Sequence, residues 1–148
     1  MGNRALILLK IDVHFFNNRR NLVFLRSKIL KYMNIEEIRD YCLSLKGAEE
    51  CFPFDETTLV MKVGGKIFAF IPLEYTDVQI NLKCDPDLAI ELREKYEAVQ
   101  PGYHMNKKYW NTVFISSEIT GKQLKDWIKH SYDEVIKGLP KSQRENYS

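Results

Sequence analysis

Three segments of the chain place apolar residues at the spacing of an amphipathic helix. They cover residues 34–46, 85–96 and 120–137. In each segment the apolar positions recur three or four residues apart, so that one face of the helix is apolar. Each segment also begins with residues typical of a helix N-terminus: Asn34 with Glu37, Asp85 with Pro86, and Thr120 with Gln123. We therefore predict three helices.

Four shorter segments alternate between apolar and polar residues, as half-buried strands do. They cover residues 57–63, 66–71, 78–83 and 109–115. Gly64-Gly65 joins the first two. Two adjacent glycines between strands indicate a tight hairpin, because the favoured hairpin turns need positive φ.

The order helix, three strands, helix, strand, helix predicts an α+β fold, with an antiparallel sheet and helices packed on one face. The other face carries polar side chains and is expected to stay open to a partner. We interpret residues 48–56 and 98–108 as loops and the last eight residues as frayed. Trp110 and Phe114 are assigned to the core.

Charge divides the chain into two unlike parts. Residues 1–32 carry seven Lys/Arg and one acid, a net charge of +6, whereas residues 33–148 carry 15 Lys/Arg and 19 acids, a net charge of −4. Met33 directly precedes the first helix start. We therefore expect residues 1–32 to be an extension outside a single domain of residues 33–148, with Met33 as a candidate initiator and the extension as an upstream translated segment. An acidic domain that binds nucleic acid must gather its cations on one face.

The cysteines indicate a reducing compartment. Cys42, Cys51 and Cys84 are odd in number and lack C-x-x-C spacing, so a disulfide framework or a zinc site is not expected. No apolar run reaches the roughly 20 residues that cross a bilayer. We expect a cytoplasmic, monomeric protein with no cofactor and no membrane partner.

The densest group of hydrogen-bonding and aromatic side chains lies at Pro101–Val113, PGYHMNKKYWNTV. Lysines can contact phosphate, asparagines can give specific hydrogen bonds and aromatic rings can stack on a ligand. The candidate binding residues are Tyr103, His104, Asn106, Lys107, Lys108, Tyr109 and Asn111. The alternative is a structured loop with solvated lysines.

Two further lysines flank the predicted hairpin tip. Lys62 and Lys66 stand on either side of the glycine pair. A basic hairpin can act as a wing against DNA, and the alternative is that these charges only keep an exposed hairpin soluble.

The sequence offers little support for catalysis. No nucleophile elbow, zinc-protease motif or phosphate-binding glycine loop occurs, and a pair of His104 with a cysteine would be the only nucleophile–base arrangement. The acids early in the domain could bind hard cations loosely, or simply be solvated. They are Glu36, Glu37, Asp40, Glu49, Glu50, Asp55 and Glu56.

The stretch GYHMNKK followed by WNTV resembles the MmcQ/YjbR-like family of small bacterial proteins. Further agreement lies in NIEEIRDYCLSLKGAEE, FPFD, VGGKIFA, NLKCDP and SYDEV, over about residues 33–139. The resemblance implies a CyaY-like (frataxin-like) α+β fold and DNA binding of the "double wing" kind. The family motif most often has His where this chain has Tyr109, and no catalytic residue set transfers. The frataxin-like fold also suggests iron binding through Glu36, Glu37, Asp40, Glu49 and Glu50.

Our leading hypothesis is a non-enzymatic binding module that contacts DNA or another anionic ligand. In this hypothesis Lys107 and Lys108 contact phosphate, and the loop's aromatic and amide groups contact the rest of the ligand. The alternatives are a protein–protein interaction domain that uses the open sheet face and, more weakly, metal binding or a small enzyme centred on His104.

Overall fold

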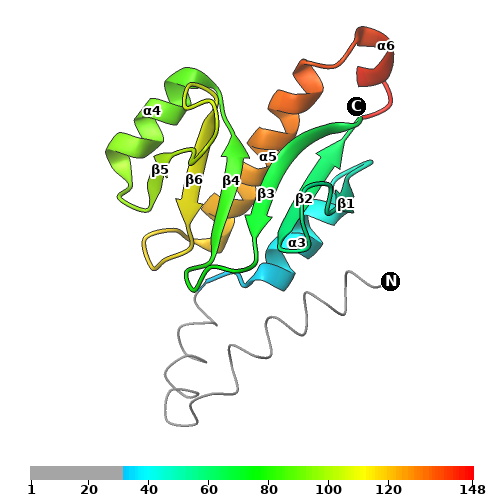
Figure 1. Ribbon diagram of the computed structural model, residues 1–148. Coiled ribbons are helices and arrows are strands. Elements are labelled where there is room, and N and C mark those ends of the chain that lie inside the picture. Colours follow the sequence, from blue (N-terminus) through cyan, green and yellow to red (C-terminus); the bar gives the residue numbers. More distant parts are fainter. Residues whose placement is uncertain (1–31) are drawn as a thin grey trace.

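The computed structural model describes residues 32–148, so the predicted N-terminal extension lies outside the described range except for Tyr32. The described residues form one sheet with helices behind it (Figure 1). The helices are α3 (Ile35–Ser44), α4 (Pro86–Lys95), α5 (Gly121–Lys137) and α6 (Lys141–Arg144). The strands are β1 (Glu49–Cys51), β2 (Thr58–Val63), β3 (Lys66–Pro72), β4 (Gln79–Lys83), β5 (Val99–Pro101) and β6 (Trp110–Phe114).

The sheet is antiparallel throughout, in the order β1-β2-β3-β4-β6-β5. The β2–β3 hairpin turns at Gly64 and Gly65, with φ of 57° and 75°. Glycine adopts this left-handed region without the steric cost that a Cβ brings. The predicted α+β class and the predicted hairpin are both confirmed.

The first and last long helices cover one face of the sheet. In Figure 1, α3 and α5 lie behind the strands, and α4 lies beside β5 and β6. Phe68 of β3 is fully buried against this layer and meets the ring of Tyr132 of α5 edge-on, with centroids 5.6 Å apart. All three predicted helix caps form, and α3 and α5 both have complete capping boxes.

Strands β3 and β4 separate at one end, and a helix side chain closes the gap. Their pairing is limited to Ala69 with Leu82 and Phe70 with Asn81. Beyond that point Ser131 of α5, which is completely buried, accepts a hydrogen bond from Lys83 N at 2.8 Å and donates one to Phe68 O at 2.5 Å. The hydroxyl of Ser131 therefore takes the place of backbone hydrogen bonding between β3 and β4 at this end of the sheet.

Edge strand β1 is fastened to α3 by an ion pair. Arg39 donates to both carboxylate oxygens of Glu50, each at 2.5 Å. Arg39 is buried, and the hydrogen bonds that it donates to Glu50 raise its pKa. Two-point pairing of this kind fixes orientation as well as distance.

Three sequence-based assignments were wrong. Residues 48–56 and 98–108, which the sequence pattern predicts to be loops, contain the short edge strands β1 and β5. The last eight residues include α6, and Tyr147 packs beside the core, against Gly47, where an added Cβ would meet its ring at 2.5 Å. Finally, Trp110 is only half-buried and lies on the open face of the sheet, not in the core. Phe114 lies on the same face and is also half-buried, but it packs against the core.

Among residues 32–148, no helix has both the length and the apolar character that a membrane span requires.

Candidate functional site

The open face of the sheet carries a mixed polar and aromatic surface. Register pairs Gln79 with Phe114, Asn81 with Thr112 and Lys83 with Trp110, and alternation puts all six side chains on the face away from the helices. Thr112 Oγ1 donates to Asn81 Oδ1 at 2.5 Å. This internal hydrogen bond fixes the middle of the face and leaves both ends for a ligand.

Three lysines meet at one end of this face, and we call this group the lysine end. Lys62 lies near the end of β2, Lys66 begins β3 and Lys83 ends β4, so antiparallel pairing brings them to one edge. They line a hollow of about 490 Å³. The full lining is Lys62, Gly65, Lys66, Ile67, Phe70, Lys83, Trp110, Val135 and Gly138. The hollow therefore combines positive charge with aromatic surface.

A row of aromatic rings leads away from the lysine end. The rings of Trp110 and Phe70 meet edge-on with centroids 5.4 Å apart, and Phe70 stacks on Phe54 at 6.2 Å. Phe54 is 67% exposed. Aromatic faces of this kind can stack on planar ligand groups.

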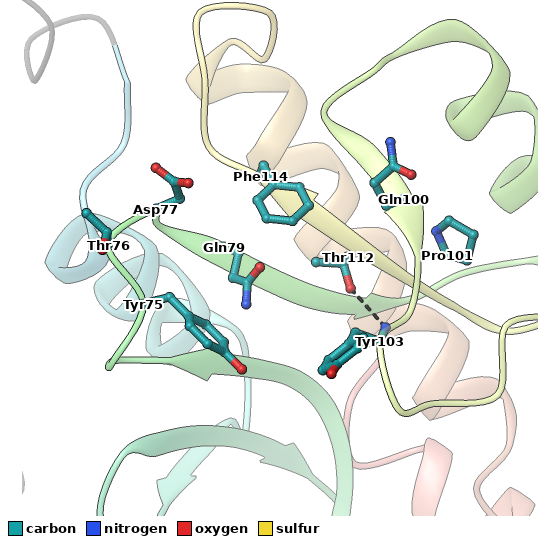
Figure 2. A pocket seen from close by; sticks show the side chains of 9 residues that line it. All are labelled: Tyr75, Thr76, Asp77, Gln79, Gln100, Pro101, Tyr103, Thr112 and Phe114. Carbon is teal, nitrogen blue, oxygen red and sulfur yellow. Dashed lines mark hydrogen bonds between the residues drawn. The ribbon is translucent and has the colours of Figure 1, made fainter.

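A second hollow of about 550 Å³ lies on the same face, and we call it the tyrosine hollow. Figure 2 shows Tyr75 and Tyr103 on either side of it, with Gln79 between them. The full lining is Tyr75, Thr76, Asp77, Gln79, Gln100, Pro101, Tyr103, Thr112 and Phe114. Among residues 32–148, no lysine or arginine lines this hollow, and Asp77 gives it a carboxylate.

The predicted loop lies beside the lysine end, between β5 and β6. His104 has φ of 55°, a left-handed conformation uncommon outside glycine, and its ring lies 4.0 Å from that of Tyr103. Lys107 Nζ donates to Gly102 O at 3.2 Å, and Lys108 Nζ lies 5.3 Å from the centre of the Tyr109 ring. The two lysines therefore differ: Lys107 is partly used in shaping the loop, whereas Lys108 stays at the surface.

Two asparagines of the predicted site have structural contacts. Asn106 Oδ1 accepts from Lys108 N at 3.0 Å and so closes a turn. Asn111 is only 2% exposed and points to the helix side, where its Oδ1 accepts from Arg93 Nε at 2.6 Å and its Nδ2 donates to Ala89 O at 3.3 Å. Asn111 therefore holds the strand against α4 and cannot face a ligand on the open surface, which corrects its predicted role.

Arg93 of α4 shapes this loop and was missed in the sequence. Besides Asn111, its guanidinium donates to Lys107 O and to Trp110 O, the latter at 3.3 Å. Its position in the last turn of a predicted helix suggested only an exposed basic residue. The residues on the open face that were also missed are Phe70, Tyr75, Asp77, Gln79, Lys83, Gln100 and Thr112. The polar residues Gln79, Asn81 and Lys83 alternate along one strand, and this pattern could have indicated that they share the open face.

The cations of the site are not neutralised by ion pairs within residues 32–148. The ion pairs there involve Arg39 and three lysines of α5, so Lys62, Lys66 and Lys83 form none. Glu49 stands opposite Lys62 in the β1–β2 register and is the nearest cross-strand acid. The lysine end is therefore a positive patch on an acidic domain.

The two buried thiols, those of Cys42 and Cys84, are poor nucleophiles. Burial raises the pKa of Cys42 to about 12, and burial together with the charges of Asp85 and Glu134 raises the pKa of Cys84 to about 12. Both are protonated at neutral pH, and a thiol reacts as its thiolate. Residues 32–148 contain no group of three or more His, Cys, Asp or Glu placed to hold a metal ion. Two of the acids considered for metal binding have other partners, since Glu37 caps α3 and Glu50 binds Arg39.

Comparison with known proteins places the chain among small bacterial relatives. It is 40% identical over 107 residues to the uncharacterised protein YbdF of Escherichia coli O157:H7, covering 72% of this chain and 87% of the relative. It is 30% identical over 112 residues to the uncharacterised protein YjbR of Escherichia coli strain K12, covering 76% and 95%.

Solved structures agree with the fold. The crystal structure of Deinococcus radiodurans protein DR2400, which carries a DUF419 domain, is 33% identical with a TM-score of 0.73, covering 77% of this chain and 87% of that chain. A Pseudomonas syringae protein of 24% identity shares the fold with a TM-score of 0.60, covering 69% and 98%. The YjbR family model matches residues 43–134. The chain therefore belongs to the YjbR family.

Proposed function

We propose that this protein is a non-enzymatic binding module for single-stranded DNA, which it holds across the open face of the sheet. In this proposal phosphates lie on Lys62, Lys66 and Lys83, and bases stack against Phe70 and Trp110. Lys108 at the neighbouring loop adds to the positive field that attracts the strand.

The observation that carries the proposal is the gathering of the lysine end in a domain of net charge −4. Here Lys62, Lys66 and Lys83 come from three strands and share one hollow with two aromatic rings. Positive charge next to stacking surface is the combination that single-stranded nucleic acid requires.

The aromatic rings favour single-stranded DNA over a duplex. Bases in a duplex are stacked on one another, so only an unpaired base can offer its plane to Trp110 or Phe70. Lys66 at the hairpin could also meet a duplex groove in the manner of a wing, but that mode leaves the aromatic row unused.

The proposal assigns no catalytic role to His104, Cys42 or Cys84. His104 is exposed and its ring packs on Tyr103, and within residues 32–148 it has no hydrogen-bonded carboxylate to orient it as a base. The buried thiols of Cys42 and Cys84 are protonated at neutral pH.

A protein partner on the same face is the second candidate. The observation that favours it is the apolar surface formed by Phe54, 67% exposed, against Phe70. Exposed aromatic residues are enriched where proteins bind one another. A partner held in this way would bind with little dependence on salt, whereas phosphate contacts release counterions and depend on it strongly.

Tryptophan fluorescence tests the DNA proposal directly, because Trp110 and Trp127 are the two tryptophans of the chain. In the full chain with Trp127→Phe, titration with a twelve-residue oligo(dT) should quench the emission of Trp110, because a base stacks on the indole. A hairpin duplex of equal charge should quench it much less.

The control is the full chain with Trp110→Phe. Trp127 packs on Tyr96 of the helix layer, with centroids 5.3 Å apart, so its emission should stay constant as DNA binds. If oligo(dT) binds by anisotropy while the emission of Trp110 is unchanged, or if no binding occurs at about 50 mM salt, the proposed function is wrong.

A further inference from the structure

The tyrosine hollow differs in chemistry from the lysine end on the same face. Its walls are Tyr75 and Tyr103, 53% and 63% exposed, and Phe114 lies behind them (Figure 2). Large aromatic side chains this exposed lose contact with water when a flat ring lies against them. The described part of the chain contributes one carboxylate and no cation to the lining, so the hollow suits a neutral ring better than a phosphate.

The hydrogen-bonding groups of the hollow are largely unused. Within residues 32–148 the side-chain amide of Gln79 and the carboxylate of Asp77 have no hydrogen-bonding partner. Gln100 uses one amide hydrogen on Glu97 O, at 2.7 Å, which leaves its oxygen free. These groups supply more acceptors than donors.

One wall is held in place by the sheet. Thr112 Oγ1 accepts from Tyr103 N at 3.2 Å, shown as the dashed line in Figure 2, while donating to Asn81. The backbone of Tyr103 is thereby tied to β6, and the loop that follows is tied through Arg93. A pocket with a fixed wall can select a ligand shape, because little conformational freedom is lost on binding.

We propose that the tyrosine hollow takes one base of the bound strand and prefers a base with an exocyclic amine. The base lies between Tyr75 and Tyr103, and its amine donates to Asp77 while Gln79 contacts the adjacent edge. A carboxylate accepts from an amine such as cytosine N4 but faces carbonyl oxygens on both sides of the single N–H of thymine. The inference rests on the proposed function, since the lysine end holds the phosphates of the same strand.

The two hollows lie close enough for one DNA strand to reach both. Trp110 lines the lysine hollow, and Thr112 and Phe114 line the tyrosine hollow. These residues alternate along β6, so successive members are about 7 Å apart. A DNA strand with one base stacked on Trp110 can therefore place a neighbouring base in the tyrosine hollow.

Ten-residue oligo(dC), oligo(dA) and oligo(dT) serve as probes in anisotropy titrations of the full chain. We expect oligo(dC) and oligo(dA) to bind about tenfold more tightly than oligo(dT), the size of effect given by one good edge contact. Asp77→Ala should remove this preference by weakening oligo(dC) and oligo(dA) relative to oligo(dT), because only their bases offer an amine to the carboxylate. Tyr75→Ala should weaken all three by about tenfold through lost stacking.

Glu74→Ala is the matched control, because this exposed acid lies in the same turn but does not line the hollow. It should keep the preference. Circular-dichroism melts of each variant identify any loss of folding, and Asp77→Asn provides a second variant of unchanged size. If oligo(dT) binds with Trp110 quenching but the preference is absent or survives both Asp77 variants, this inference is wrong and the proposed function stands. If no oligonucleotide binds, both fail.

Discussion

Replacing Lys62, Lys66 and Lys83 together by glutamine should weaken binding of single-stranded DNA by about 100-fold at about 0.1 M salt. Each phosphate contact releases about 0.7 counterion, which is worth about fivefold in affinity at that salt concentration. The slope of log affinity against log salt should become less steep by about 2. Anisotropy titrations over a salt series, from about 50 to 300 mM, measure both quantities.

The control removes three charges from the opposite side of the domain. Lys122, Lys125 and Lys129 lie on α5, and their joint replacement by glutamine changes the net charge equally. Because both variants keep residues 1–32, whose charge is +6, any contribution of that segment cancels in the comparison. Equal losses of affinity in the two triple variants would show that only net charge matters, and would contradict a site at the lysine end.

Ser131→Ala should lower the free energy of unfolding by about 2–4 kcal/mol. The serine is completely buried, and it satisfies both Lys83 N and Phe68 O where β3 and β4 separate. Each of these backbone groups would be left without a partner, at a cost of about 1–3 kcal/mol, partly relieved by water entering from the lysine hollow. Urea denaturation monitored by circular dichroism measures the change.

Ser44→Ala provides the comparison for Ser131. Ser44 also donates to a backbone carbonyl, Tyr41 O at 2.6 Å, but the bond is exposed to solvent. Water can replace it, so its loss should cost less than about 1 kcal/mol. If Ser131→Ala lowers the free energy of unfolding by no more than Ser44→Ala does, the gap between β3 and β4 closes without the hydroxyl.

The periodic segments of the sequence were enough to predict the long elements. The helix starts at Asn34, Asp85 and Thr120 have local chemical causes, and the hairpin follows from two glycines that take positive φ. Such signals act within a few residues of the chain. They can therefore be recognised in the sequence without knowledge of the tertiary contacts.

The edge strands could not be predicted in the same way. β1 and β5 have three residues each, too few to show alternation. β1 exists because it pairs with β2 and because Arg39 binds Glu50. Both causes are tertiary contacts between residues at least nine positions apart.

Only part of the candidate site could be predicted from the sequence, again because tertiary contacts decide which side chains lie on the open face. Alternation along β6 separates Trp110 from Asn111, but it does not say which of them faces the helices. Arg93 and Ala89 of α4 decide this by binding the Asn111 amide. The sequence therefore located the loop next to the lysine end. It could not indicate that Lys83, distant in the chain from Lys62, shares its hollow.

The central claim, that nucleic acid lies on the open face, is tested most directly by NMR. The full chain, labelled with ¹⁵N, is titrated with unlabelled ten-residue oligo(dC), and amide and indole shifts are followed. We expect chemical-shift changes at the amides of Lys62, Lys83 and Thr112 and at the indole N–H of Trp110. The amides of α5 and α3 should be unchanged. Changes confined to the helix layer or to residues 1–31, with the open face unaffected, would contradict it.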